Sequence, residues 1–305
     1  MRLAEIPEAQ LRHRLAGPEG VTLVTGPFST RIRSPVASVA RGLADLYGDV
    51  RVEPDADWAD FHVQVRAPRT PRRWFRPQVL FLSEGRSVFK PLAFHQAFPM
   101  LEWGLNWCVT ANVKHHLLFH AAVVAREDRA LILPAPPGSG KSTLCAGLVA
   151  SGWRLLSDEL AIVDVEAGTL TGLARPVSLK NASIEVIRSF APDAFVSDPC
   201  HDTLKGTVAH LRPPRASVDR ALAPVRPAWV VFPRFEPGAE TRLTPRVRTS
   251  AFMELARNAF NYTVLGRLGF RRTADLIERS VCYDFTYSRL DEAVATFNAM
   301  EPPSA

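Results

Sequence analysis

The chain contains 305 residues, 47% of them hydrophobic, and carries a formal net charge of +6. This length is sufficient for one large domain or for two ordinary ones with a sizeable core. The sequence has no apolar run of 18 residues, and its first twenty residues lack the apolar segment of a secretory signal. We therefore expect a cytoplasmic protein with no membrane contact. The four cysteines form no Cys-x-x-Cys pair, which argues against a zinc ribbon or a disulfide framework.

The first third of the chain is predicted to combine helices with a small sheet. A helix is predicted to begin near Ser34, since proline follows it and apolar residues then recur at helical spacing. Residues 60–94 contain alternating and short apolar runs, which predict an antiparallel β layer. Residues 101–118 have mainly helical periodicity, and we expect Trp103 and Trp107 to pack in the core.

The middle of the chain is predicted to place a glycine-rich loop between a strand and a helix. Two apolar runs, at 117–125 and 130–136, predict a β-hairpin that leads directly into "APPGSGKS" at 135–142. The helix that follows is predicted to end near Gly152, and a further strand pair is predicted over residues 154–174. Strand, loop and helix thus occur in the order that a phosphate-binding loop requires.

The glycine-rich loop departs from the usual phosphate-loop pattern where Ala135 replaces the first glycine. Alanine is tolerated there if its φ is negative, and the two prolines that follow stiffen the turn. The backbone N–H groups of such a loop bind phosphate oxygens, the lysine adds a point charge, and the Ser142 hydroxyl ligates Mg²⁺. The residues predicted to bind the nucleotide are Gly138, Ser139, Gly140, Lys141, Ser142 and Thr143.

Two consecutive acidic residues, Asp158 and Glu159, follow Lys141 by 17 and 18 residues. One helix and one short strand separate them from the loop, so a right-handed crossover is expected to place both carboxylates at the end of a neighbouring strand, beside the loop. One carboxylate can hold Mg²⁺ while the other accepts a proton from an attacking hydroxyl, and the sequence leaves open which does which. The alternative is that the pair only caps a turn or a helix.

The segment 119–163 resembles the catalytic core of the HPr kinase/phosphorylase family, in which a histidine-containing strand, a phosphate loop and an acidic pair follow in this order. The motifs "EWGLNW", "LLSDEL", "RPVSLKN" and "KGTVAHLRPP" resemble the HprK-related kinase A group across nearly the whole chain. The resemblance implies an α/β (α+β) fold of the phosphoenolpyruvate carboxykinase type with a mixed β-sheet. Residues 111–305 would form the P-loop catalytic domain, and residues 1–110 an N-terminal α/β region packed on it.

The same resemblance implies which residues act on ATP and Mg²⁺. His120, Lys141, Asp158 and Glu159 match the catalytic positions, and Ser142, Asp158 and Glu159 match the metal-binding ones. Glu159 stands where the family has a second aspartate, and alanine follows His120 where the family usually has glycine, which favours kinase over phosphorylase activity. Because His120 lies in an apolar run, a buried structural histidine is an equally good interpretation.

Together these features predict an ATP-dependent kinase that transfers the γ-phosphate to a serine or threonine hydroxyl of a peptide or small protein. The resemblance implies a peptide-modification setting, with a PqqD-like peptide-binding protein as a candidate partner. Two alternatives stay open: a non-catalytic nucleotide-binding regulator, and a kinase of a small-molecule hydroxyl. The sequence is also compatible with a homo-oligomer.

Arginines concentrate in two proline-rich stretches, 66–77 and 211–227, which we interpret as loops that steer an acidic peptide toward the site. Neither stretch shows a helix-turn-helix pattern or regularly interleaved aromatic residues, so nucleic acid is not the expected partner. Other basic residues could stabilise a transferring phosphoryl group or be ordinary surface charges. They are Lys180, Lys205, His210 and Arg212.

Overall fold

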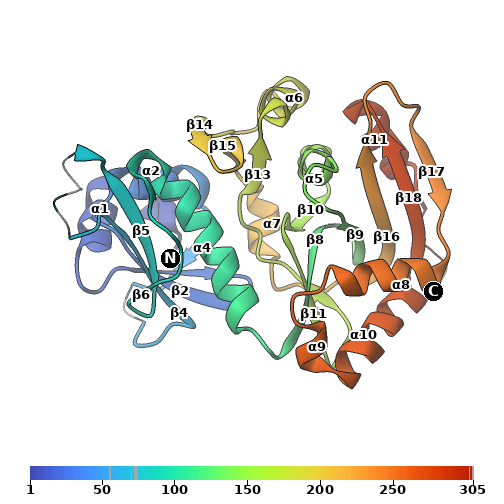
Figure 1. The fold of residues 1–305 in the computed structure, drawn as a ribbon, viewed down its shortest axis with the longest axis horizontal. Coiled ribbons are helices and arrows are strands. Elements are labelled where there is room, and N and C mark those ends of the chain that lie inside the picture. Colours follow the sequence, from blue (N-terminus) through green and yellow to red (C-terminus); the bar gives the residue numbers. More distant parts are fainter. Residues whose placement is uncertain (55, 70, 72–74, 302, 304–305) are drawn as a thin grey trace.

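The computed structural model describes residues 1–54, 56–69, 71, 75–301 and 303 (Figure 1). It shows a mixed α/β protein with two large β-sheets and one small sheet. Figure 1 shows the first sheet and its helices at one end of the molecule and the second at the other, with α4 and the small sheet between them. Within the described ranges, no helix is long and apolar enough to cross a membrane.

Residues 21–93 form the first sheet, of order β3-β1-β2-β4-β5-β6, and β7 also pairs with β5. β2 and β4 pair in parallel because α2 crosses between them, and the other pairs are antiparallel. The strands are β1 (Val21–Thr25), β2 (Phe28–Arg33), β3 (Arg51–Val52), β4 (Phe61–Arg66), β5 (Gln78–Ser83), β6 (Arg86–Ser87) and β7 (Leu92–Ala93). The helices are η1 (Leu3–Glu5), α1 (Glu8–Ala16), α2 (Ala37–Leu46), η2 (Phe94–Gln96) and α4 (Ala97–Asn112).

The second sheet has the order β12-β11-β8-β9-β16-β18-β17, and β10 pairs with β8. Its strands are β8 (His116–Arg126), β9 (Arg129–Pro134), β10 (Arg154–Ser157), β11 (Leu160–Asp164), β12 (Leu170–Thr171), β16 (Arg226–Phe235), β17 (Arg242–Pro245) and β18 (Val281–Tyr287). The small sheet has the order β13 (Val177–Lys180), β15 (Gly206–Leu211), β14 (Cys200–Thr203). The helices are α5 (Lys141–Ala150), α6 (Ala182–Phe190), α7 (Arg215–Asp219), α8 (Arg248–Arg257), α9 (Tyr262–Leu265), α10 (Arg267–Glu278) and α11 (Leu290–Asn298).

The layers form because each element buries one apolar face. α2 carries Val39, Leu43 and Leu46 at helical spacing, and all three are buried. They join α4 and the first sheet in one core. Two further cores lie on opposite faces of the second sheet, one with α5, α6 and α11 and the other with α8 and α10. Ser34 precedes α2, where its Oγ accepts the Val36 N–H, so the predicted helix is present but begins at Ala37.

The helix predicted over 101–118 differs from the structure in position and in packing. α4 begins at Ala97 and ends at Asn112, and the chain then enters β8. Trp103 is half-buried and outside the core, because α4 turns a different face inward, whereas Trp107 is half-buried but packs against the first core. That buried face includes Leu101, Glu102, Leu105, Cys108 and Val109. Trp103 instead lines a pocket beside the acidic pair, which is described below.

Candidate active site

The glycine-rich loop connects β9 to α5, as predicted, and its backbone conformation depends on two glycines. Gly138 has a φ of +88° and Gly140 a φ of +83°, both in the left-handed region that favours glycine. Ala135 is buried and its φ is negative. The condition under which alanine can replace the first glycine is therefore met.

The loop is held by the ends of two neighbouring strands of the second sheet, through residues that no sequence motif indicated. Tyr287 Oη donates to the carbonyl of Gly140 at 2.9 Å, and the Phe235 N–H donates to the carbonyl of Ser139 at 2.9 Å. A Cβ on Gly140 would lie 2.4 Å from Tyr287 Oη and 2.8 Å from Phe235 Cβ. The ends of β16 and β18 therefore fix the shape of the loop at the start of α5.

Lys141 and Asp158 form a buried pair beside the loop, with exposed fractions of 6% and 4%. Lys141 Nζ donates to the Asp158 carbonyl oxygen and lies 3.8 Å from Asp158 Oδ1. Asp158 Oδ2 accepts the Ser178 N–H at 3.2 Å, and Oδ1 has no hydrogen-bond partner. Burial raises the pKa of Asp158 and the charge of Glu159 raises it further, while Lys141 and the Ser142 hydroxyl oppose the rise.

Glu159 faces His120 rather than the loop lysine. His120 Nε2 lies 3.0 Å from Glu159 Oε2, and both side chains are partly exposed. The two residues meet because β8 and β11 pair with His120 opposite Leu160. Burial would raise the pKa of Glu159, but His120, Lys141 and Lys180 together hold that pKa well below its ordinary value. Glu159 is therefore ionised at neutral pH, and His120 is a partner of the acidic pair.

The acidic pair lies in the turn between β10 and β11, but its strand is not the immediate neighbour of β9. Both β10 and β11 pair antiparallel with β8, and β8 pairs antiparallel with β9. β9 and β10 therefore run in the same direction with β8 between them. The crossover through α5 still brings Asp158 to Lys141, because α5 begins with that lysine.

Asp158 and Glu159 line a small pocket whose opposite walls are α4 and the small sheet. Trp103 and Asn106 come from α4, and Ser178 and His210 come from β13 and β15. Residues on both sides of position 110 therefore build the surroundings of the acidic pair.

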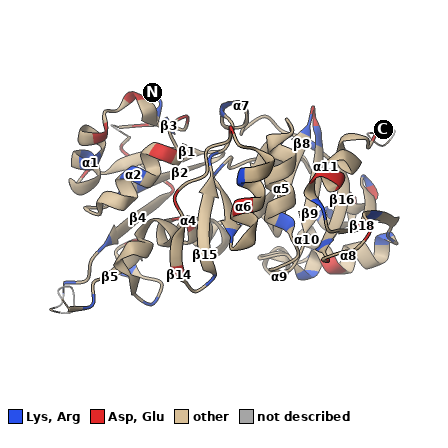
Figure 2. Cartoon of the chain, turned by 90° about the horizontal axis from the view of Figure 1, so that it is seen from above, with Lys and Arg blue, Asp and Glu red and all other residues tan. Residues whose placement is uncertain are grey.

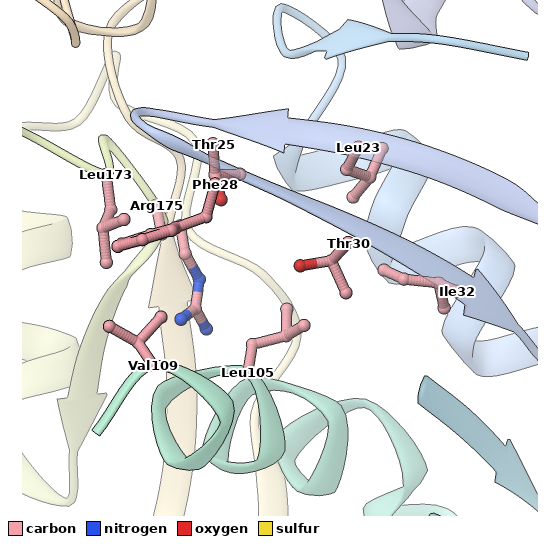
Figure 3. Close-up of a pocket in the computed structure, with 9 residues that line it drawn as sticks. All are labelled: Leu23, Thr25, Phe28, Thr30, Ile32, Leu105, Val109, Leu173 and Arg175. Atoms are coloured by element: carbon pink, nitrogen blue, oxygen red, sulfur yellow. The ribbon is translucent and has the colours of Figure 1, made fainter. Parts of the chain in front are cut away.

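Arg175 separates this pocket from an apolar hollow between the β1–β2 hairpin and α4. Figure 3 shows its guanidinium pointing toward α4, with Phe28 and Leu105 among the residues around it. The guanidinium donates to Glu102 Oε2 at 2.7 Å and to Asn106 Oδ1 at 2.8 Å. Because Arg175 and Glu102 are both buried, this ion pair rigidly joins α4 to the chain that leads into β13.

The basic residues nearest the carboxylates are lysines, not the arginines of the two proline-rich stretches. The charges of Lys141 and Lys180 lower the pKa values of both Asp158 and Glu159. The charges of these four residues in turn affect the pKa of Lys205. The chain has only five lysines against 32 arginines, so three of its five lysines gather here. Figure 2 shows the other basic residues spread along the molecule, near α1 and α2 as well as α8 and α10.

Two of the arginines of 211–227 contact the N-terminal part of the chain. Arg212 Nε donates to the Asp45 carbonyl oxygen, and Arg215 lies 3.9 Å from Asp49 Oδ1. In the other stretch, Arg72 and Arg73 lie outside the described residues. All four arginines of 211–227 are exposed, so their predicted role in steering an acidic peptide stays a prediction.

A Mg²⁺ site with ligands from protein alone is not preformed: within the described residues, no three His, Cys, Asp or Glu side chains gather as a metal site. Mg²⁺ commonly takes one or two carboxylates and completes its shell with substrate phosphates and water, and the proposed role of Ser142, Asp158 and Glu159 is considered on that basis below. The chain matches no protein-family model and no curated protein.

Proposed function

We propose that the chain is an ATP- and Mg²⁺-dependent kinase that transfers the γ-phosphate to a serine or threonine hydroxyl of a peptide or small protein. We also propose that the second and third sheets with their helices are a P-loop fold of the HPr kinase and phosphoenolpyruvate carboxykinase type. One observation carries the proposal: the buried Lys141–Asp158 pair and the His120–Glu159 pair lie together at the start of α5. A phosphate loop alone binds a nucleotide, whereas adjacent carboxylates add proton and metal chemistry.

The chain's own groups divide the work. Backbone N–H groups of 138–143 and the Lys141 ammonium would bind the phosphates. Ser142 and Glu159 would hold Mg²⁺, because a carboxylate that stays ionised is a good ligand for a hard cation. The ion would neutralise charge on the transferring phosphoryl group. His120 positions Glu159 through their 3.0 Å contact.

Asp158 is the proposed proton acceptor. Its buried Oδ1 has no hydrogen-bond partner, and its raised pKa makes it a better base than an ordinary aspartate. As the acceptor oxygen bonds to the γ-phosphorus, the bond from that phosphorus to the ADP oxygen breaks. The hydroxyl proton passes to Asp158, so the step needs no further reactant.

Calorimetry with Mg·ATP and transfer from radiolabelled ATP to serine and threonine peptide arrays test the proposal. We expect Lys141→Met to weaken nucleotide binding about tenfold or more, since a charge-assisted contact is lost. Asp158→Asn should keep nucleotide affinity and lose transfer, while Glu159→Gln should lose the Mg²⁺ dependence of binding. Glu166→Gln, an exposed carboxylate on the turn after β11, is the matched control.

Two results would count against this function. If Mg·ATP bound the wild-type chain and Lys141→Met equally well, the loop assignment would be wrong. If Mg·ATP bound but neither transfer nor slow hydrolysis occurred, the regulator alternative would replace the kinase.

A further inference from the structure

The pocket beside the acidic pair contains an unusual concentration of buried polar atoms without partners. Four of the residues that line it each contribute one, namely Trp103 Nε1, Asp158 Oδ1, Ser178 Oγ and His210 Nε2. Buried polar atoms are nearly always hydrogen-bonded, because an unpaired one has lost its bonds to water without replacing them. A cluster of them in one pocket points to a polar group that binds there.

The small sheet explains why these atoms meet. Ser178 on β13 pairs with His210 on β15, so their side chains project from the same face of the sheet. Val177, Leu179 and Ala209 alternate with them and pack into the core with α5 and α6 on the opposite face. The polar face is therefore turned toward α4, which brings Trp103 to the pocket.

Besides Asp158, two further carboxylates line the pocket, and each already has a partner: Glu102 pairs with Arg175, and Glu159 with His120. The unpaired groups other than Asp158 can donate hydrogen bonds. The indole of Trp103 can only donate, and the Ser178 hydroxyl can donate. Burial and the charges of Arg175, Lys180 and Lys205 lower the pKa of His210, so its imidazole is neutral and carries one N–H. Lys205 Nζ lies 5.0 Å from the Trp103 ring centroid, which holds a cation over the pocket wall.

We propose that this pocket binds a carboxylate of the phosphoryl acceptor, with Trp103, Ser178 and His210 as hydrogen-bond donors and Lys205 as the counter-charge. The inference rests on the proposed kinase function and adds a substrate class to it: hydroxyl acceptors that carry a carboxylate near the hydroxyl. Asp158 lines the same pocket, so binding the carboxylate brings the hydroxyl to the proposed proton acceptor.

Two small probes that differ only at the proposed contact test the subsite directly. N-acetyl-L-serine carries the carboxylate, and N-acetyl-L-serinamide replaces it with a neutral amide. With 5-fluorotryptophan in the chain, the fluorine resonance of Trp103 can be assigned by its loss in Trp103→Phe, since the chain has six tryptophans. We expect N-acetyl-L-serine to shift that resonance saturably, and the amide to shift it at least about tenfold more weakly.

Variants separate the subsite from the nucleotide site. Lys205→Met and Ser178→Ala should each weaken N-acetyl-L-serine binding several-fold and leave Mg·ATP affinity nearly unchanged. Lys90→Met is the control, because Lys90 is exposed in the loop between β6 and β7. Phosphoserine as a third probe distinguishes a carboxylate site from a general oxyanion site.

Each outcome decides the inference. Equal binding of the serine and serinamide probes, or no shift with either, would overturn the subsite. Loss of Mg·ATP affinity in Lys205→Met would assign that lysine to the nucleotide site and would also overturn the carboxylate subsite. Tighter binding of phosphoserine than of N-acetyl-L-serine, through its phosphate, would overturn the subsite too. Selective serine binding without any Mg·ATP binding would support the subsite and reject the kinase.

Discussion

Replacing Lys141 with methionine should reveal how strongly the phosphate loop depends on its buried ion pair, even without nucleotide. Lys141 Nζ lies 3.8 Å from Asp158 Oδ1, and both side chains are buried. At an effective dielectric constant of about 20, this separation corresponds to an attraction of about 4 kcal/mol. Removing one partner of a buried pair leaves the other charge uncompensated, so we expect the free energy of unfolding to fall by about 3 kcal/mol.

The pH dependence of this loss has a definite sign. Burial already raises the folded-state pKa of Asp158 above its ordinary value of 3.8, and Lys141 limits the rise. Without Lys141 the folded pKa climbs further, so the folded state holds its proton to higher pH than the unfolded state does. The stability of Lys141→Met should therefore decrease more steeply than that of the wild type as pH rises above the unfolded value, and be nearly equal to it in acid.

Urea unfolding followed by circular dichroism, with a metal chelator and without nucleotide, measures the free energy of unfolding of the wild type and of Lys141→Met across pH. The double variant Lys141→Met with Asp158→Asn should recover much of the loss, because no buried charge remains. A difference between Lys141→Met and wild type that did not change with pH, or a double variant as unstable as Lys141→Met, would refute the reasoning.

Three further changes test other parts of the site. Gly140→Ala should impair Mg·ATP binding in calorimetry far more than Gly138→Ala: both glycines have positive φ, but only a Cβ at Gly140 would collide with Tyr287; equal effects would contradict this. Arg175→Met should lower the free energy of unfolding by about 3 kcal/mol, seen as a lower urea midpoint, because it leaves the buried Glu102 carboxylate unpaired. An unchanged midpoint would show that the pair contributes little to stability. A thiol-reactive dye should modify Cys200 first in the native chain, since the other three cysteines are buried; rapid reaction of all four thiols before unfolding would exclude the packing described.

Much of the geometry of the glycine-rich loop could be predicted from sequence, for a local reason. The loop, its lysine and the helix that follows are contiguous, and glycines with positive φ leave a visible pattern. The acidic pair is separated from the loop by one helix and one strand, so its approach to Lys141 followed from a single crossover. What the pattern could not show was that β8 lies between β9 and β10, because strand order depends on pairing distant in sequence.

The supporting contacts were not predictable, because each joins residues far apart in the chain. Tyr287 lies 147 residues from the carbonyl of Gly140 that it holds. Glu102 and Arg175 are 73 residues apart, and although each begins one of the quoted motifs, nothing in those motifs shows that the two pair. The interpretation of Trp103 as a core residue followed from helical spacing alone, which cannot reveal that α4 turns a neighbouring face inward.

One compositional signal could have led to the acceptor side of the site. Because nearly all basic residues of this chain are arginines, the few lysines indicate positions where lysine has a specific role. Lysine differs from arginine in presenting a compact point charge that tolerates partial burial. Lys180 and Lys205 lie at the end of β13 and in the turn before β15, so the small sheet presents both to the carboxylates. Trp103 on α4 lines the pocket from the other side. The buried Glu102–Arg175 pair fixes the distance between α4 and the chain that leads into β13. The part of the chain before position 110 thus supplies a wall of the proposed acceptor pocket, which makes acceptor choice a property of both parts of the fold.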